Sequence, residues 1–152
     1  MLAGVKMRLL PSDDLMHPLE EAVNFNESAY YNFHDAGCGL GHGLQALRQA
    51  YPLAQLHGLE WSWPLTLLCR WRCKWADVQR GDIWRGDWSR YDLVYLFQRP
   101  ESMPRAVEKA RTELKPGAWL VSLEFEAAGL TPVAKLDGTH GKPVWVYRAP
   151  LL

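Results

Sequence analysis

Glycine occupies every second position in a loop that follows a short apolar segment. Residues 35–43 read DAGCGLGHG, so the alternation runs from Gly37 to Gly43 directly behind Asp35. Glycine adopts positive φ and lets a ligand approach the backbone where a Cβ would clash. A helix that begins at such a loop presents free N–H groups to the same site. The pattern predicts a ligand-binding loop, in which Asp35 is a ligand contact or a helix cap.

Two common kinds of glycine loop fit this sequence less well. A phosphate-binding loop ends in Gly-Lys-Ser/Thr, and no lysine follows these glycines. A dinucleotide fingerprint, G-x-G-x-x-G/A, matches residues 41–46, but the chain after it is short for a second half and a substrate domain. A small dinucleotide-binding protein is kept as an alternative function.

Two more acids stand at the ends of predicted strands. Glu60 ends an apolar segment over residues 53–59, and Asp82 follows a shorter segment that begins at Val78. Ligands of doubly wound sheets bind outside the carboxyl ends of the strands. Both acids are expected near the glycine loop, where they would accept hydrogen bonds from a ligand. The structural alternatives are a helix cap at Glu60 and a turn at Asp82.

Short apolar strands that alternate with helices must position these residues. Strands are predicted at 32–34, 53–59, from 78, at 91–97 and at 118–125, and helices at 44–51, 64–75 and 104–114. This order predicts an α/β fold with a doubly wound, mostly parallel sheet. Segments 131–136 and 144–147 predict a C-terminal antiparallel hairpin.

One domain is expected over residues 1–152. Within it we expect an N-terminal helical or lid segment (1–28), a ligand-binding core (29–127) and the terminal hairpin (128–152).

Composition and charge exclude several function classes. The chain has 152 residues with 17 Lys+Arg and 17 Asp+Glu, so it lacks the overall basic field of a dedicated nucleic-acid binder. Residues 70–75, RWRCKW, are typical of an RNA surface or of a solvated helix face with buried tryptophan, and the second interpretation is favoured. No apolar run approaches the roughly 20 residues of a membrane-spanning helix, and residues 1–10 do not resemble a secretory signal.

The cysteines predict reduced thiols rather than a disulfide framework. Cys38, Cys69 and Cys73 are an odd and sparse set, which indicates a cytoplasmic protein. Zinc requires four ligands, and no paired Cys or His motif supplies the remainder. We therefore expect no metal, and core packing for these thiols.

The register D-x-G-x-G-x-G, formed by Asp35, Gly37, Gly39 and Gly41, resembles motif I of the class I S-adenosylmethionine-dependent methyltransferases. Residues 91–97 resemble the fourth strand of that family, and residues 114–120 resemble the turn into its fifth. The resemblance implies that S-adenosylmethionine is the cofactor. It also implies that Asp35 and the glycine backbone hold the methionine part.

The same resemblance assigns the remaining cofactor contacts. Glu60, followed by Trp61, would accept the ribose hydroxyls, and Asp82 with Ile83 would contact the adenine. Phe97, at the end of the fourth strand, completes the expected cofactor site.

A narrower resemblance concerns the substrate. Residues 81–84, 88–92, 103–104 and 114–117 resemble a small group of lysine methyltransferases that modify mitochondrial carrier or ATP synthase proteins, and their bacterial relatives. The loop differs from theirs, since it reads GCGLG where theirs reads GSGDG. Pro11 and Ser12 match an element of that group that touches cofactor or substrate. The resemblance implies a protein lysine as the methyl acceptor.

The segment after the fourth predicted strand is expected to face the substrate. Gln98, Arg99 and Pro100 stand there in place of the Pro-Pro-Tyr signature of amide and base N-methylation, which counts against adenine or glutamine as substrate. Nucleic acid is otherwise left open as a partner. No general base is identified, so a non-catalytic S-adenosylmethionine-binding or partner-docking module is the second interpretation.

Overall fold

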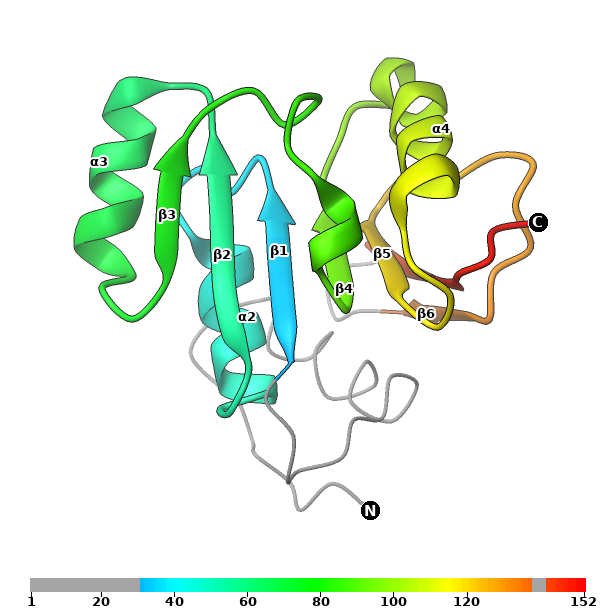
Figure 1. Cartoon of the computed structure of the whole chain (residues 1–152), viewed down its shortest axis with the longest axis horizontal. Helices are drawn as coiled ribbons and strands as arrows, with labels where there is room; N and C mark the ends of the chain where they lie inside the picture. The colour runs from blue at the N-terminus through cyan, green and yellow to red at the C-terminus, as the bar shows by residue number, and fades with distance from the viewer. Residues whose placement is uncertain (1–30, 138–141) are drawn as a thin grey trace.

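A computed structural model describes residues 31–137 and 142–152, in which seven strands form one sheet (Figure 1). The strands are β1 (Asn32–Ala36), β2 (Gln55–Glu60), β3 (Asp77–Arg80), β4 (Leu93–Leu96), β5 (Trp119–Leu123), β6 (Ala134–Asp137) and β7 (Pro143–Arg148). The helices are α2 (His42–Ala50), α3 (Trp63–Arg72) and α4 (Met103–Glu113), with short 3-10 turns η1 (Trp88–Arg90) and η2 (Pro100–Ser102).

The sheet order is β3-β2-β1-β4-β5-β7-β6. The first five of these strands run parallel, whereas β7 lies antiparallel between β5 and β6. The chain moves outward from β1 through β2 to β3 and then crosses to β4 on the other side. This switch point between β1 and β4 is where doubly wound sheets bind their ligands. The predicted fold class and the antiparallel C-terminal strands are confirmed.

Helices cover both faces of the sheet. In Figure 1, α2 and α3 lie behind the sheet and α4 lies in front of it. Side chains of β1 alternate between the two cores, because successive strand residues point to opposite faces. Phe33 packs with Leu44 and Leu47 of α2, whereas Ala36 packs with Val107 on the side of α4. Among the described residues, no helix is long and apolar enough to cross a membrane.

The helix α2 begins at the glycine loop, as predicted. Gly41 is its N-cap with φ 91°, and its buried side chains include Leu44 and Leu47. The N–H of Tyr51 closes the last turn on the carbonyl of Leu47. Pro52 follows, and proline cannot continue the hydrogen-bond ladder of a helix.

The helix α3 differs from its predicted form. It ends at Arg72 rather than near Trp75, and its buried residues are the small Thr66 and Cys69. Leu68 is exposed, and Trp71 is 70% exposed. The prediction of a buried tryptophan on this helix was therefore wrong for Trp71. Small side chains allow a close approach of the helix to the core, so the large apolar ones face outward.

Candidate functional site

The glycine loop is tied to the end of β2 by its backbone. The N–H groups of Gly37 and Cys38 both donate to the carbonyl of Leu59, at 2.8 and 3.1 Å. Gly37 and Gly39 have φ of 80° and 53°, which L side chains rarely adopt. A Cβ built on Gly39 would meet no atom within 4 Å. The loop is thus held firmly, while the space beside Gly39 is open to a ligand.

Glu60 is held between this loop and the start of α3. Its Oε1 accepts a hydrogen bond from the N–H of Gly39 at 3.0 Å, and its Oε2 accepts one from the N–H of Ser62 at 2.7 Å. Ser62 is the N-cap of α3, so the alternative role of Glu60 as that cap does not apply. Each carboxylate oxygen has a second lone pair, which leaves Glu60 able to accept bonds from ligand hydroxyls.

A cavity of about 430 Å³ opens at the carboxyl ends of the central strands. Its lining comprises Gly37, Glu60, Trp61, Asp82, Ile83, Trp84 and Gln98. Volumes of this size are typical of small-molecule sites. The carboxylates of Glu60 and Asp82 can accept hydrogen bonds from the hydroxyl and amino groups of an adenosine. The two indoles of the lining and the side chain of Ile83 can pack against its planar base. The residues present therefore fit the cofactor that the sequence resemblance implies.

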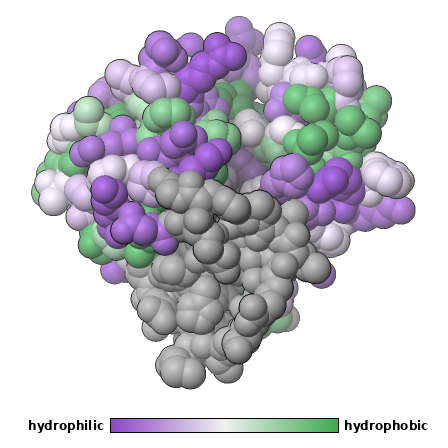
Figure 2. Space-filling view, turned by 180° about the vertical axis from the view of Figure 1, so that it is seen from behind, coloured by the Kyte–Doolittle hydropathy of each residue, from purple (hydrophilic) through white to green (hydrophobic). Residues whose placement is uncertain are grey.

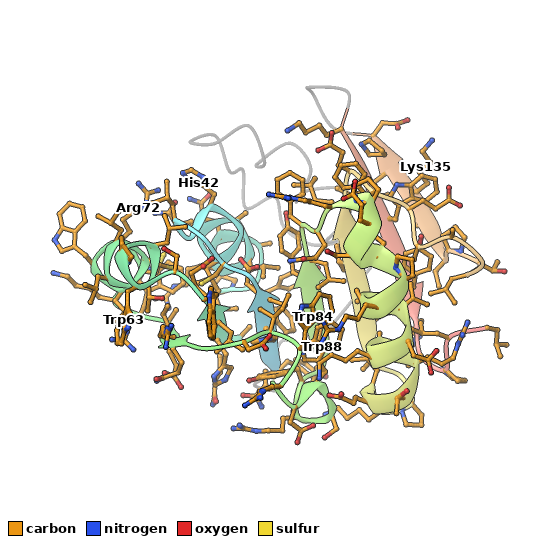
Figure 3. The ribbon with its side chains drawn as sticks, turned by 90° about the horizontal axis from the view of Figure 1, so that it is seen from above. His42, Trp63, Arg72, Trp84, Trp88 and Lys135 are labelled. Atoms are coloured by element: carbon orange, nitrogen blue, oxygen red, sulfur yellow. The ribbon has the colours of Figure 1, made fainter. Side chains whose placement is uncertain are left out.

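The side of this cavity that Asp82 and Trp84 line belongs to a segment that α4 holds in place. The Oδ1 atom of Asp82 accepts from the N–H of Trp84 at 2.9 Å, which closes a tight turn. Lys109 donates to the carbonyl of Trp84 at 3.1 Å and pairs with Glu113 at 2.6 Å. Glu113 in turn accepts from the N–H of Trp88 at 2.8 Å. Figure 3 shows Trp84 and Trp88 next to each other beside α4. Lys109 and Glu113 thus hold both ends of residues 84–88.

Asp35 lies beneath the loop rather than in the cavity lining. It is 3% exposed, and burial together with the nearby carboxylate of Glu60 raises the pKa of Asp35 to about 7. A Cβ on Gly43 would lie 2.6 Å from its Oδ2 atom. Tyr95, its register partner in β4, has its pKa raised by burial and by Asp35. The carboxyl group therefore packs against the first turn of α2.

The three cysteines pack next to the glycine loop. All three are free and buried, and the Sγ atoms of Cys69 and Cys38 are 3.7 Å apart. A Cβ on Gly41 would lie 2.6 Å from the Sγ atom of Cys73. A hydrogen bond to Cys38 and burial raise the pKa of Cys69 to about 12, so its thiol stays protonated. Within the described ranges, no group of His, Cys, Asp and Glu side chains is arranged to hold a metal ion.

The structure gathers most of the predicted site residues. Gly37, Glu60, Trp61, Asp82, Ile83 and Gln98 line one cavity, and Gly39 and Gly41 belong to the loop beside it. Phe97, Arg99 and Pro100 follow the end of β4 but are not part of the lining. Pro11 and Ser12 lie outside the described residues. Trp84 is a lining residue that the sequence interpretation missed; its signal was an aromatic residue two positions after Asp82.

An aromatic surface lies past the end of β4. Phe97 is 49% exposed and stacks on Phe125, with ring centroids 6.3 Å apart. The ammonium of Lys142 lies 5.6 Å from the Phe97 ring and 3.8 Å from the carboxylate of Glu124. Glu124 has φ 73°, an uncommon conformation for a residue other than glycine. This surface therefore already accommodates one lysine side chain of the chain itself.

Comparison with known proteins identifies the family. The family model described as the ANTKMT methyltransferase domain matches residues 35–134. The chain belongs to this family. The match spans β2 to β5, the glycine loop and the cavity described above, and it makes the chain a class I S-adenosylmethionine-dependent methyltransferase domain by fold and family. The cofactor of such domains is S-adenosylmethionine.

Individual relatives agree with this assignment. A lysine N-methyltransferase of Xenopus laevis, named for the ATP synthase protein that it modifies, is 32% identical over 66 residues, which are 43% of this chain and 29% of that protein. The chain thus spans less than a third of the length of this curated relative.

Among solved structures, an RNA methyltransferase from Salinibacter ruber in complex with S-adenosyl-L-homocysteine has a TM-score of 0.77 at 22% identity, covering 90% of both chains. The PH0226 protein of Pyrococcus horikoshii OT3 has a TM-score of 0.70 at 14% identity, covering 90% of this chain and 88% of that one. At these identities the two structures show a shared fold.

Proposed function

We propose that this methyltransferase domain transfers a methyl group from S-adenosylmethionine to a lysine side chain of a protein. The observation that carries the proposal is the family match over residues 35–134, which covers the whole cofactor cavity. The lysine acceptor is supported by the curated relative, whose name states lysine N-methylation of an ATP synthase protein.

Different residues of the cavity would contact different parts of the cofactor. Glu60, oriented by the backbone of Gly39 and Ser62, would accept the ribose hydroxyls. Asp82 and the side chains of Ile83 and Trp84 would contact the adenine. When bound, S-adenosylmethionine supplies a methyl group on a positively charged sulfur, which an uncharged amine accepts. The chain contributes mainly alignment and exclusion of water, which together supply several kcal/mol of rate enhancement.

The aromatic surface past β4 supports a lysine acceptor. The Phe97 ring is exposed and lies next to the lining residue Gln98. Aromatic faces attract ammonium groups and also pack against the aliphatic part of a lysine. The position of Lys142 over this ring is consistent with such a contact and supports the proposal. A partly dehydrated mouth also lowers the pKa of an incoming lysine, which favours the neutral amine needed for attack.

The test is methyl transfer from radiolabelled S-adenosylmethionine to the components of a cell extract. Labelled material is treated with protease or nuclease, and labelled protein is hydrolysed to amino acids. We expect protease-sensitive label that is recovered as methylated lysine, and no label with the Glu60→Ala variant. Label in nuclease-sensitive material would assign a nucleic-acid substrate instead. Tight binding of S-adenosylhomocysteine without any transfer would favour the non-catalytic binding module.

A further inference from the structure

The outward face of α3 is apolar, which is the reverse of an ordinary surface helix. With about 100° between successive helix residues, Trp63, Leu67, Trp71, Pro64 and Leu68 fall in that order on one continuous arc of about 140°. All five are exposed, and Trp71 and Leu67 are 70% and 56% exposed. In Figure 2 hydrophobic side chains gather at the upper right, the end of the molecule where α3 lies. We call these five residues the α3 apolar face.

Basic side chains border this face on both sides. On the same helical projection Arg70 flanks one edge of the arc and Arg72 the other. Lys74 follows the end of the helix, and the Arg80 guanidinium stacks on Trp61 and Trp63 at 4.4 and 5.4 Å. The sequence holds no Asp or Glu between residues 61 and 76. The border is therefore cationic throughout, although the whole chain has no net charge.

The arginines of the border are held in place rather than free. Arg70 donates through Nε to the carbonyl of Val78 at 2.8 Å, and Arg80 donates through Nε to the carbonyl of Trp61 at 3.1 Å. A guanidinium has five N–H donors, so each keeps donors for an external anion. Figure 3 shows Trp63 and Arg72 on α3 at the end of the molecule remote from α4.

We propose that the α3 apolar face docks on an anionic lipid bilayer, with its indoles and leucines in the interface and its arginines on lipid phosphates. Exposed Trp and Leu bordered by Arg and Lys are the composition of helices that lie in the plane of a membrane surface. Anionic headgroups complement the cationic border. The proposal is independent of which acceptor the methyl group reaches.

Two other occupants fit the face less well. A single-stranded nucleic acid would stack on the indoles and pair with the arginines, but it would leave the side chains of Leu67 and Leu68 in water. A protein partner needs a groove to receive a convex helix, whereas a bilayer interface adapts to it. The favourable free energy of burial grows with the apolar area covered, so a partner that also covers the leucines gains more.

The experiment measures co-sedimentation of the full chain with vesicles of phosphatidylcholine alone or mixed with phosphatidylglycerol. We expect binding to the mixed vesicles that weakens with salt, and a loss of at least about tenfold in the double variant Leu67→Ser, Trp71→Ser. The matched control is Leu53→Ser, Val133→Ser, which removes two exposed apolar side chains elsewhere. To test the role of the cationic border, the sedimentation of the Lys74→Glu variant with the mixed vesicles is compared with that of Arg111→Glu, a charge reversal on α4.

Circular dichroism of every variant first establishes that the fold is retained. Equal sedimentation of wild type and the α3 double variant would overturn the proposal, as would absence of binding to both kinds of vesicle. Binding of a single-stranded oligonucleotide that the α3 variant alone loses, without vesicle binding, would assign the face to nucleic acid. A dimer that the same variant dissociates, without vesicle binding, would assign it to a second copy of the chain.

Discussion

The backbone N–H of Gly39 donates to the Oε1 atom of Glu60 at 3.0 Å, and this bond joins the glycine loop to the carboxyl end of β2. The partner bond from Ser62 to Oε2 leaves the carboxylate no freedom to turn away. One side chain thus sets the position of the loop, of the α3 N-terminus and of the cavity wall. Changes at either residue should affect cofactor binding more than folding.

Replacing Glu60 by alanine tests its role at the ribose. We expect weaker binding of S-adenosylhomocysteine by about 1.5–3 kcal/mol, the usual cost of a lost hydrogen bond to a charged group. Isothermal titration calorimetry measures the dissociation constant. Glu108→Ala is the matched control, because Glu108 is an exposed carboxylate on α4. An unchanged dissociation constant would make Glu60 a purely structural link between loop and helix.

Two glycines of the loop should respond differently to the same substitution. In Gly39→Val the new Cβ meets no protein atom within 4 Å, so the protein should fold with modest backbone strain and lose cofactor binding. In Gly41→Val it would meet the Sγ atoms of Cys73 and Cys69 at 2.6 and 3.0 Å, so stability itself should fall. Thermal melting and titration calorimetry on both variants separate the two effects. Normal binding by Gly39→Val would place the cofactor elsewhere.

The sequence was sufficient for the fold because its strongest signals are local. The loop, the helix with Leu44 and Leu47, and the stop at Pro52 lie within one short stretch, and the structure confirms them. The insertion of β7 between β5 and β6 was not predicted, because the pairing of strands distant in sequence depends on the whole sheet. On α3 the predicted core packing of Cys69 is confirmed, but the predicted burial of tryptophan is wrong for Trp71, because the small Thr66 and Cys69 face the core and the large side chains face outward.

Most residues that line the candidate site were predicted, but the residues of α4 that hold the lining in place were not. Glu60 ends β2 and Asp82 lies two residues past the end of β3, and an acid at such a place is a signal in the sequence. Lys109 and Glu113 form an i, i+4 pair that in a sequence is indistinguishable from a surface ion pair. Their bonds to residues 84 and 88, each 25 positions away, appear only in three dimensions.

The α4 pair gives a prediction about positioning. Glu113→Gln should loosen the segment that carries Trp84, because the N–H of Trp88 and the ammonium of Lys109 both lose a charged partner. We expect roughly three- to tenfold weaker binding of S-adenosylhomocysteine, within the cost of one such bond. Glu108→Gln on the same helix is the control. Should both variants bind alike, α4 would not position the adenine side.

Asp35 predicts a pH dependence of stability. Its folded pKa of about 7 lies above the ordinary value of 3.8, so the fold keeps a proton that the unfolded chain has lost. The contribution of this group to the free energy of unfolding of the cofactor-free protein should therefore fall as pH rises from about 4 to about 7, with no further change above 7. His34, whose pKa burial lowers to about 3, acts in the opposite direction below its ordinary pKa of 6.5.

The variant Asp35→Asn isolates the contribution of this carboxyl group. The difference in unfolding free energy between variant and wild type should shift in favour of the variant by roughly 2–4 kcal/mol between pH 4 and pH 8, as expected for a pKa shift of this kind. Urea denaturation at several pH values measures it, and the contribution of His34 cancels in the difference. A constant difference across that range would mean that Asp35 is ionised in the fold at neutral pH.

Arg99 tests the substrate side of the site. It lies exposed at the start of η2, past the lining residue Gln98, and it is not part of the cofactor cavity. A cation at this place repels a protonated lysine and attracts an acidic flank on the target protein. Arg99→Glu should therefore slow methyl transfer at least about tenfold, while the affinity for S-adenosylhomocysteine stays within about twofold. Arg111→Glu, also exposed but on α4, is the matched control.

Equal rates for wild type and Arg99→Glu on the same protein substrate would leave Arg99 as an ordinary surface residue. Weaker cofactor binding in that variant would instead place the segment after β4 against the cofactor.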